Sequence, residues 1–600
     1  MMGGGLAHLR NSAGNDTRPL NLQVVLRLLR FTAPHRRHLV IAVAMALCGA
    51  VMTVGAPYLL KIGIDQGITR RDVHVVLITA GLYLLTRIGA ATFSYVQTLH
   101  VNLLGNGAVY DLREEFFAKL MDLGLRYYDR EPVGVIVSYG TNDVTALSNL
   151  VSSGIVSIIT DGVTLVGIIV IMLVISPWLA LASFTVLPVL VLITRWFQNH
   201  AIHAYRQVRT QIGQLTAQFE EGISGVRITQ AFSREDENAR RFSRVNQANL
   251  DANMGAAMIN NTFGPAVNLI SAVGTVIVLW FGGSEVLHAA VTIGTLVAFL
   301  SYLSRFFQPI QDLTQQYNLV QQAMAAAEKI FSALDEPVEV QDRGQAASMP
   351  PIQGHVRFRD VSFAYESGRQ AVSHLDCELP AGHRAALVGH TGAGKSTIAS
   401  LLLRFYDPDE GAIEVDGIDL RTVSQKSYRR QTAIVLQDPV LFSASIADNI
   451  RYGRLDASMA EVEAAATAVG ADRFIRKLPG GYQTPVGERG TRLAQGEKQL
   501  LSFARALLAN PRILVLDEAT ANVDSESEHL IQEAMARLLA GRTSLIIAHR
   551  LSTIRDADLI LALENGQVVE RGSHAELLEA GGLYASLYQR QFERLAAAGA

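Results

Sequence analysis

Six apolar stretches of about 20 residues dominate the first half of the chain and limit what it can fold into. A helix needs about 20 apolar residues to cross roughly 30 Å of bilayer hydrocarbon. No stretch contains more than one charged residue, although Arg87 lies within the second and Asp161 within the third. We therefore predict six membrane spans, at residues 39–60, 75–99, 155–176, 178–197, 263–283 and 289–310.

Charged residues are distributed unevenly along the chain. They make up 58 of the 246 residues in 355–600, about 24% and ordinary for a soluble domain, but only 49 of the 354 before them. Prolines at 337, 350 and 351 lie where the fraction of charged residues changes, and they indicate a boundary between domains. The predicted division is a flexible N-terminus at 1–21, a membrane domain at 22–335, a linker at 336–354, a soluble domain at 355–590 and a tail at 591–600.

Two bulk properties exclude other classes of protein. The net charge of −3 argues against a surface that binds nucleic acid. Two cysteines, Cys48 and Cys377, are too few for a disulfide framework. The histidines at 74, 100 and 288 show no metal-ligand spacing.

The connections between the predicted spans differ greatly in length. About 55 residues separate the second span from the third and about 65 separate the fourth from the fifth, whereas the other connections are short. Apolar residues recur at heptad-like spacing in 109–125 and 212–232, which predicts long helical hairpins on one side of the membrane. Basic residues flank that side, at 27, 30, 36, 37, 206 and 209, so it is predicted to be cytoplasmic, although Arg70 and Arg71 oppose this orientation. A short helix at 22–31 is predicted to lie on the inner leaflet.

A phosphate-binding loop follows a short buried-strand pattern at 385–388 and precedes a predicted helix at 398–405. Glycines let backbone N–H groups close around phosphates, and the helix N-terminus adds its dipole. Lys395 would reach the β- and γ-phosphates, and the Ser396 hydroxyl would ligate Mg²⁺. The loop consists of Gly389, His390, Thr391, Gly392, Ala393, Gly394, Lys395, Ser396 and Thr397.

Two further strand patterns end in candidate catalytic groups. Asp517 and Glu518 follow the apolar run at 513–516, and His549 follows the run at 544–548. Beside a phosphate-binding loop, Asp517 suits the Mg²⁺ shell and Glu518 suits polarising the attacking water. A histidine at such a strand end can contact the γ-phosphate.

These motifs, in this order, resemble those of half-transporters of the ATP-binding-cassette (ABC) exporter family. The resemblance covers about residues 25–590 and implies a six-helix transmembrane domain of the type I exporter fold followed by an α/β P-loop ATPase domain. It implies that Tyr365 stacks on adenine and that Gln437 contacts Mg²⁺ and senses the membrane domain. Segment 486–490 resembles the exporter-specific loop, Ala521–Asp524 the D-loop (with Asp524), and His549 the switch histidine. Residues 128–134 and 222–232, at the two hairpin tips, match the family's coupling helices.

One segment departs from the family pattern. The signature Leu-Ser-Gly-Gly-Gln corresponds here to Leu493, Ala494, Gln495, Gly496 and Glu497. Ala494 lacks the serine hydroxyl that would bind the γ-phosphate, at a cost of roughly 1.5–3 kcal/mol, and Glu497 adds a negative charge. Since the family pairs two cassettes head to tail, we predict a heterodimer in which the partner chain brings an intact signature; a homodimer is the alternative.

The predicted function is ATP-driven export of amphipathic drugs, lipids or peptides. The chain is predicted to lie in the inner or plasma membrane, with both termini and the ATPase domain in the cytoplasm. Alternatives are a lipid flippase or an importer on the same fold, or an ATP-gated channel. Asp161 and Arg87 either face a cavity as polar substrate contacts, form a structural pair, or extend to the membrane interface. The aromatic residues Tyr302, Phe306 and Phe307 either line a drug cavity or pack between helices, and Tyr584, Tyr588 and Phe592 indicate an amphipathic helix packed on the cassette.

Overall fold

The structure of the chain is a computed structural model. The structure describes residues 27–28, 30–342, 344, 346–365, 368, 370–487, 490–517, 525–548 and 551–589. The chain divides into two compact units: a helical unit of residues 1–121 and 134–336, and an ATPase unit of residues 122–133 and 337–600. Residues 122–133, which contain the predicted first hairpin tip except Gly134, therefore belong to the ATPase unit and are called the first hairpin tip below.

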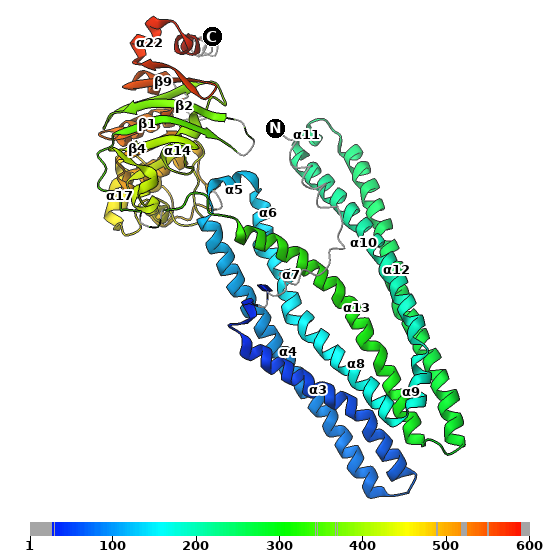
Figure 1. Cartoon of the computed structure of the whole chain (residues 1–600). Helices are drawn as coiled ribbons and strands as arrows, with labels where there is room; N and C mark the ends of the chain where they lie inside the picture. The colour runs from blue at the N-terminus through cyan, green and yellow to red at the C-terminus, as the bar shows by residue number, and fades with distance from the viewer. Residues whose placement is uncertain are drawn as a thin grey trace. The chain divides into compact units, whose positions relative to one another are not determined.

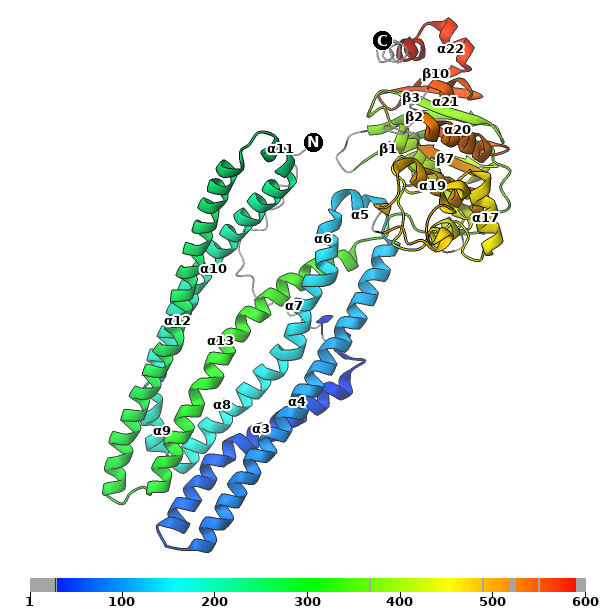
Figure 2. The ribbon, with the colours of Figure 1, turned by 180° about the vertical axis from the view of Figure 1, so that it is seen from behind.

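Long helices that run side by side build the helical unit (Figures 1 and 2). Helix α10 and helix α12 form one extended hairpin that ends at α11, as the sequence predicted. Short π-helical turns follow α3, α6 and α7. The helices are α3 (Arg36–Ile62), α4 (Val73–Asp122), α6 (Val133–Ser138), α7 (Val144–Asn149), α8 (Ile155–Ile175), α9 (Pro177–Phe184), α10 (Leu187–Ser224), α11 (Val226–Ala231), α12 (Glu235–Leu287) and α13 (Ile293–Asp335).

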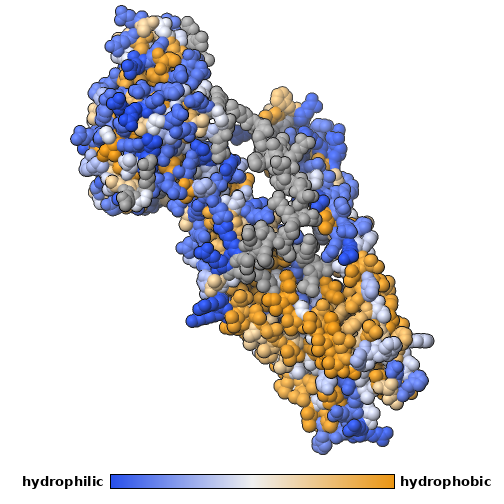
Figure 3. All heavy atoms as spheres, viewed as in Figure 1, coloured by the Kyte–Doolittle hydropathy of each residue, from blue (hydrophilic) through white to orange (hydrophobic). Residues whose placement is uncertain are grey.

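Five helical segments among the described residues are long and apolar enough to cross a membrane, and they contain the first five predicted spans, the third except its last residue. The sixth predicted span falls mainly in α13, which is not among the five, so it stays a prediction. The fourth span is broken between α9 and α10, because Pro188 lacks an N–H group and its ring clashes with the preceding turn. In Figure 3 hydrophobic residues gather in one band of the helical unit, while hydrophilic residues dominate the ATPase unit.

The core of the helical unit joins α8, α9, α12 and α13. Ile168 and Met172 of α8 pack there with Val267 of α12 and Phe299 of α13, all fully buried. Tyr302, Phe306 and Phe307 belong to the same cluster. These three aromatic rings therefore pack between helices, and the alternative that they line a drug cavity is wrong for this structure.

Two sheets form the ATPase unit. A four-stranded antiparallel sheet has the order β2-β1-β4-β5, and a six-stranded, mostly parallel sheet has the order β10-β9-β3-β8-β7-β6. The strands are β1 (Val356–Ala364), β2 (Gln370–Leu379), β3 (Arg384–Gly389), β4 (Glu410–Val415), β5 (Ile418–Asp419), β6 (Thr432–Val435), β7 (Ile513–Asp517), β8 (Thr543–Ile547), β9 (Leu559–Glu564) and β10 (Gln567–Gly572).

Helices cover the parallel sheet and complete the unit. They are α5 (Leu125–Arg130), α14 (Lys395–Leu402), α15 (Gln425–Arg429), α16 (Ile446–Arg451), α17 (Met459–Ala468), α18 (Asp472–Ile475), α19 (Gln495–Ala509), α20 (Ser525–Leu539), α21 (Leu551–Arg555) and α22 (His574–Ala580). Near the C-terminal end, Tyr584 is buried in the ATPase core and Tyr588 packs against it, which confirms the predicted packing of this segment. Phe592 lies outside the described residues.

Candidate functional site

The site forms where strands β3, β6, β7 and β8 end. Strand β3 pairs with β8, β8 with β7, and β7 with β6, all in parallel, so the carboxyl ends of the four strands meet at one edge of the sheet. The phosphate-binding loop follows β3, Gln437 follows β6, and Asp517 ends β7. The sheet therefore gathers residues from three distant parts of the chain, and β8 lies between β3 and β7.

Glycines shape the phosphate-binding loop. Gly392 and Gly394 have φ values of 85° and 100°, which other residues rarely adopt. A Cβ atom at Gly394 would lie 2.5 Å from the Ala371 carbonyl oxygen, and one at Gly389 would lie 2.4 Å from that of Leu563. Neighbouring backbone therefore approaches Gly389 and Gly394 too closely for any residue with a Cβ atom. Helix α14 begins at Lys395, so its N-terminal N–H groups point to the loop.

Lys395 is the buried cation of the loop. Its Nζ donates to the carbonyl oxygens of Gly389 at 2.8 Å and His390 at 3.0 Å. Burial lowers the pKa of Lys395, and the nearby Asp517 carboxylate opposes that shift. The ammonium is thus held between the loop and the acidic end of β7, where it can meet a phosphate.

The residues predicted to hold Mg²⁺ fit a hard, oxygen-ligated cation. Ser396 offers a hydroxyl at the exposed start of α14, Asp517 a carboxylate, and Gln437 an exposed amide carbonyl, from three elements that end at the same edge. A magnesium ion there would neutralise charge on the phosphates. Glu518, His549 and Asp524 lie outside the described residues, as do Glu488 and Arg489 of the predicted exporter-specific loop.

The predicted adenine-stacking residue sits in an aromatic cluster beside the phosphate-binding loop. Tyr365 follows β1, and its hydroxyl lies 3.2 Å from Thr397 Oγ1 of α14. Its ring meets those of Phe363 and Tyr406 edge-on, with centroids 5.0 Å and 5.7 Å away. Tyr406, which sequence reasoning missed, thereby holds the orientation of Tyr365.

The signature segment (493–497) forms the N-terminus of α19. A Glu497 carboxylate oxygen accepts a hydrogen bond from the Ala494 N–H at 2.8 Å. The negative charge of Glu497, which the sequence predicts near the ligand, therefore caps the N-terminus of its own helix. In a complete capping box the side chain of the N-cap residue would accept the N–H of Glu497. Ala494 has no side-chain acceptor, so only the hydrogen bond from the Ala494 N–H to Glu497 forms. Gln495 Nε2 reaches Asp438 Oδ1, beside Gln437, at 3.4 Å.

A second residue that sequence reasoning missed is Arg505 of α19. It donates to the carbonyl oxygens of Asn449 at 2.9 Å and Val440 at 3.0 Å. Burial lowers the pKa of this arginine. Arg505 therefore ties the segment after Gln437 to the helix that carries the signature segment. Its position in an amphipathic helix gave no signal of this contact.

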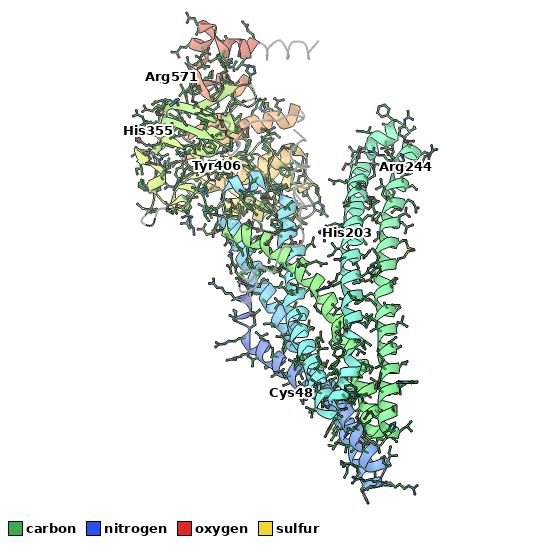
Figure 4. The ribbon with its side chains drawn as sticks, turned by 45° about the vertical axis from the view of Figure 1, so that its right-hand side comes forward. Cys48, His203, Arg244, His355, Tyr406 and Arg571 are labelled. Carbon is green, nitrogen blue, oxygen red and sulfur yellow. The ribbon has the colours of Figure 1, made fainter. Side chains whose placement is uncertain are left out.

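The first hairpin tip, residues 122–133, is docked on the ATPase unit. The Tyr406 hydroxyl donates to the Asp129 carboxylate, a contact near the label in Figure 4. Arg126 pairs with Glu339 at 2.9 Å, and its guanidinium lies 5.9 Å from the Phe363 ring centroid. Burial, reinforced by Asp129, raises the pKa of Tyr406. Helix α5 thus contacts the same aromatic cluster that holds Tyr365.

The second hairpin tip, residues 222–232, behaves differently. It belongs to the helical unit, and Ile228 and Phe232 are 67% and 73% exposed. Ile223 is also largely exposed. Such a cluster of exposed apolar side chains at a hairpin tip is typical of a surface that another chain covers.

Comparison with known proteins accounts for this arrangement. The model of the ABC transporter transmembrane region matches residues 39–310, and that of the ABC transporter domain matches residues 372–521. An uncharacterized ABC transporter ATP-binding protein, YknV of Bacillus subtilis (strain 168), is 40% identical over 581 residues, 96% of each chain. The chain belongs to the ABC transporter family. It is therefore a multi-pass membrane protein with a cytoplasmic, ATP-hydrolysing domain.

Two further ABC proteins place the chain among exporters. An ATP-dependent lipid A-core flippase of Syntrophus aciditrophicus (strain SB) is 35% identical over 572 residues, 95% of each chain. The solved structure of a bacterial Atm1-family ABC exporter with ATP bound has a TM-score of 0.78 and 34% identity, over 93% of this chain and 98% of that one. The predicted exporter fold, a transmembrane domain followed by an ABC ATPase domain, is confirmed.

The two ionisable residues noted in the predicted spans do not pair with each other. Asp161 lies in α8 and Arg87 in α4. No ion pair joins Asp161 to Arg87 in the described part of the chain. The alternative that they form a structural pair is therefore wrong, and the alternatives of a polar substrate contact and of interfacial snorkelling stay predictions.

Proposed function

We propose that this chain is one half of an ATP-driven exporter of amphipathic molecules and that its partner is a half-transporter of different sequence. The observation that supports it best is the common sheet edge at which the phosphate-binding loop, Gln437 and Asp517 meet. In this proposal Lys395 and Mg²⁺ stabilise charge on the phosphates and Glu518 orients the attacking water. His549 contacts the γ-phosphate.

The two hairpin tips support a dimer. Helix α5 is already docked on this chain's own ATPase unit through Asp129 and Arg126. The second tip keeps its apolar side chains exposed. A partner's ATPase domain would cover them, so that each ATPase domain contacts helices of both chains.

The signature segment supports a heterodimer. A γ-phosphate brought to α19 would find no hydroxyl at Ala494, and it would meet the Glu497 carboxylate on the same helix end. Two copies of this chain would form two equally weakened sites. A partner with an intact signature segment would form one strong site with this chain's Lys395 and Glu518.

The experiment is to purify the chain alone and together with candidate half-transporters from the same organism. We expect robust ATPase activity only for a mixed dimer, and Lys395→Ala in this chain should abolish it. High activity from a symmetric dimer of this chain would refute the heterodimer.

Transport in proteoliposomes separates the exporter from its alternatives. ATP-dependent movement of a fluorescent lipid between leaflets would favour a flippase, which the flippase relative supports. ATP-dependent extrusion of a dye would favour drug export. Ion currents without cargo movement would refute both and leave the ATP-gated channel.

A further inference from the structure

Two histidines meet where the first two predicted spans reach their inner ends. His38 lies directly before the span at 39–60, and His100 lies directly after the span at 75–99. His38 belongs to α3 and His100 to α4, two helices of the helical unit. Both side chains are half-buried, so protons from water can reach them.

The two imidazole rings face each other through the same kind of nitrogen. The Nδ1 atoms of His38 and His100 lie 2.8 Å apart, and the ring centroids lie 5.1 Å apart. A hydrogen bond at that distance needs one N–H donor and one lone pair. When both rings are protonated, neither nitrogen can accept, and two like charges face each other. The hydrogen bond therefore exists only while at most one of the two rings is charged.

An apolar cluster lies beside the pair. Ala42 of α3 packs there with Val101 of α4 and Val156 of α8. Ala42 is one turn along α3 from His38, and Val101 directly follows His100. Among the described residues each imidazole has the other as its one hydrogen-bond partner. In this part of the chain, neither ring is therefore bonded to a carboxylate that could compensate a second charge.

A second histidine contact close by responds to acid in the opposite sense. His35, one turn before His38, has its Nε2 atom 3.0 Å from Asp111 Oδ2 of α4. Protonation of His35 turns this contact into an ion pair and strengthens it, so acid does not loosen α3 from α4 there. The other charged residues nearest the pair along the packed elements are Arg30, Arg36 and Arg37 before and in α3, Arg87 in α4 and Asp161 in α8, and the turn at 150–154 has none.

We propose that His38 and His100 form a pH-sensitive latch between the inner ends of the first two spans. The latch is closed while at most one ring is protonated, and it opens when both are. Imidazole is the side chain that ordinarily changes charge between pH 5 and 8. The open latch binds a proton on each ring and the closed latch binds at most one, so a fall in pH favours the open latch.

Amide hydrogen exchange measures how often the latch opens. The purified full-length transporter, with its partner chain if one is needed, is placed in lipid nanodiscs with EDTA, so that no metal ion bridges the rings. Exchange in residues 36–42 is compared at about pH 7.5 and about pH 5, near the two ends of the range in which imidazole titrates. Each rate is divided by the rate of the unstructured peptide at the same pH, which removes the chemical effect of pH. We expect the corrected exchange to be about tenfold faster at the lower pH, and no difference would overturn the proposal.

Glutamine variants test the two rings. His100→Gln replaces one ring with an amide that can donate and accept at either pH. The acid-induced acceleration should therefore fall from about tenfold to less than about twofold. His38→Gln is the reciprocal change with the same expected result, and it serves as the test if His100→Gln does not assemble. An acceleration as large as that of the unaltered protein in either variant would contradict the latch.

Two further histidine variants are controls. His200→Gln changes an exposed histidine of α10 whose Nδ1 contacts the Trp196 carbonyl oxygen of its own helix, and it should keep the full acceleration. His35→Gln removes the contact with Asp111 and should keep it too. Loss of the acceleration in His35→Gln would assign the acid effect to His35, and loss in His200→Gln would show a general effect; either result would overturn the proposal. None of these measurements requires ATP hydrolysis, so the test is independent of the proposed function.

Discussion

The bond between Tyr406 and Asp129 should decide how firmly α5 is held on the ATPase unit. It joins the first hairpin tip to the aromatic cluster around Tyr365. Replacing Tyr406 with phenylalanine removes the hydroxyl and keeps the ring. The Phe363 and Tyr365 contacts should therefore survive, and only the link to α5 should be lost.

The size of the effect follows from the exposure of the acceptor. A hydrogen bond to a charged group contributes about 1.5–3 kcal/mol, and because Asp129 is exposed we expect the lower end of that range. A loss of about 1.4 kcal/mol corresponds to tenfold in an equilibrium constant. Amide hydrogen exchange in residues 125–130 should therefore become about tenfold faster in Tyr406→Phe if exchange follows local opening.

A double-mutant cycle with Asp129→Ala completes the test. The single variants and the double variant should accelerate exchange by similar factors, because each removes the same bond. Tyr482→Phe is the matched control: its hydroxyl donates to Asp472 at 2.7 Å in the same unit and touches no residue of α5. Unchanged exchange in Tyr406→Phe, or an equal change in Tyr482→Phe, would refute the reasoning.

Three other substitutions have defined outcomes. Gly394→Ala should abolish nucleotide binding, measured by equilibrium titration, because its Cβ would lie 2.5 Å from the Ala371 carbonyl oxygen. Ala494→Ser should raise the ATPase rate of the assembled transporter by about 10- to 100-fold, since it restores a hydroxyl that can bind phosphate. Arg27→Met should reduce the acid sensitivity of thermal stability. The hydrogen bonds from Arg27 lower the pKa of Asp335 in the folded state. The pair therefore stabilises the folded state at pH values above the unfolded pKa of Asp335, near 3.9. This stabilisation is lost as the pH falls through the lower pKa of the folded state.

Controls make these outcomes specific. Gly255→Ala, in α12, meets nothing within 4 Å and should leave nucleotide binding intact. Ala494→Ser should have no effect if the signature segment never meets ATP. The pair of Arg27 and Asp335 is largely exposed, so its effect should stay below about 1 kcal/mol. A larger change would contradict the assignment.

Local patterns in the sequence determined much of this protein. Periodicity and length predicted the apolar stretches and the two long hairpins with their tips, and glycine placement predicted the phosphate-binding loop. Each of these signals depends only on residues that are close in sequence. The strand pattern that ends at Asp517 sufficed to predict this residue beside the loop, whereas Gln437 was predicted only through the family resemblance. Even the departure at Ala494 was visible in the sequence.

Only the tertiary structure decided which distant groups meet. Tyr406 reaches Asp129 across 277 residues, and Arg305 reaches Thr53 across 252. The sequence left open whether Arg87 and Asp161 face a cavity or each other, and no ion pair joins them among the described residues. Such contacts depend on helix rotation and strand order, which are set by the packing of whole buried faces. No local spacing records that packing, so these two contacts emerge only from the fold.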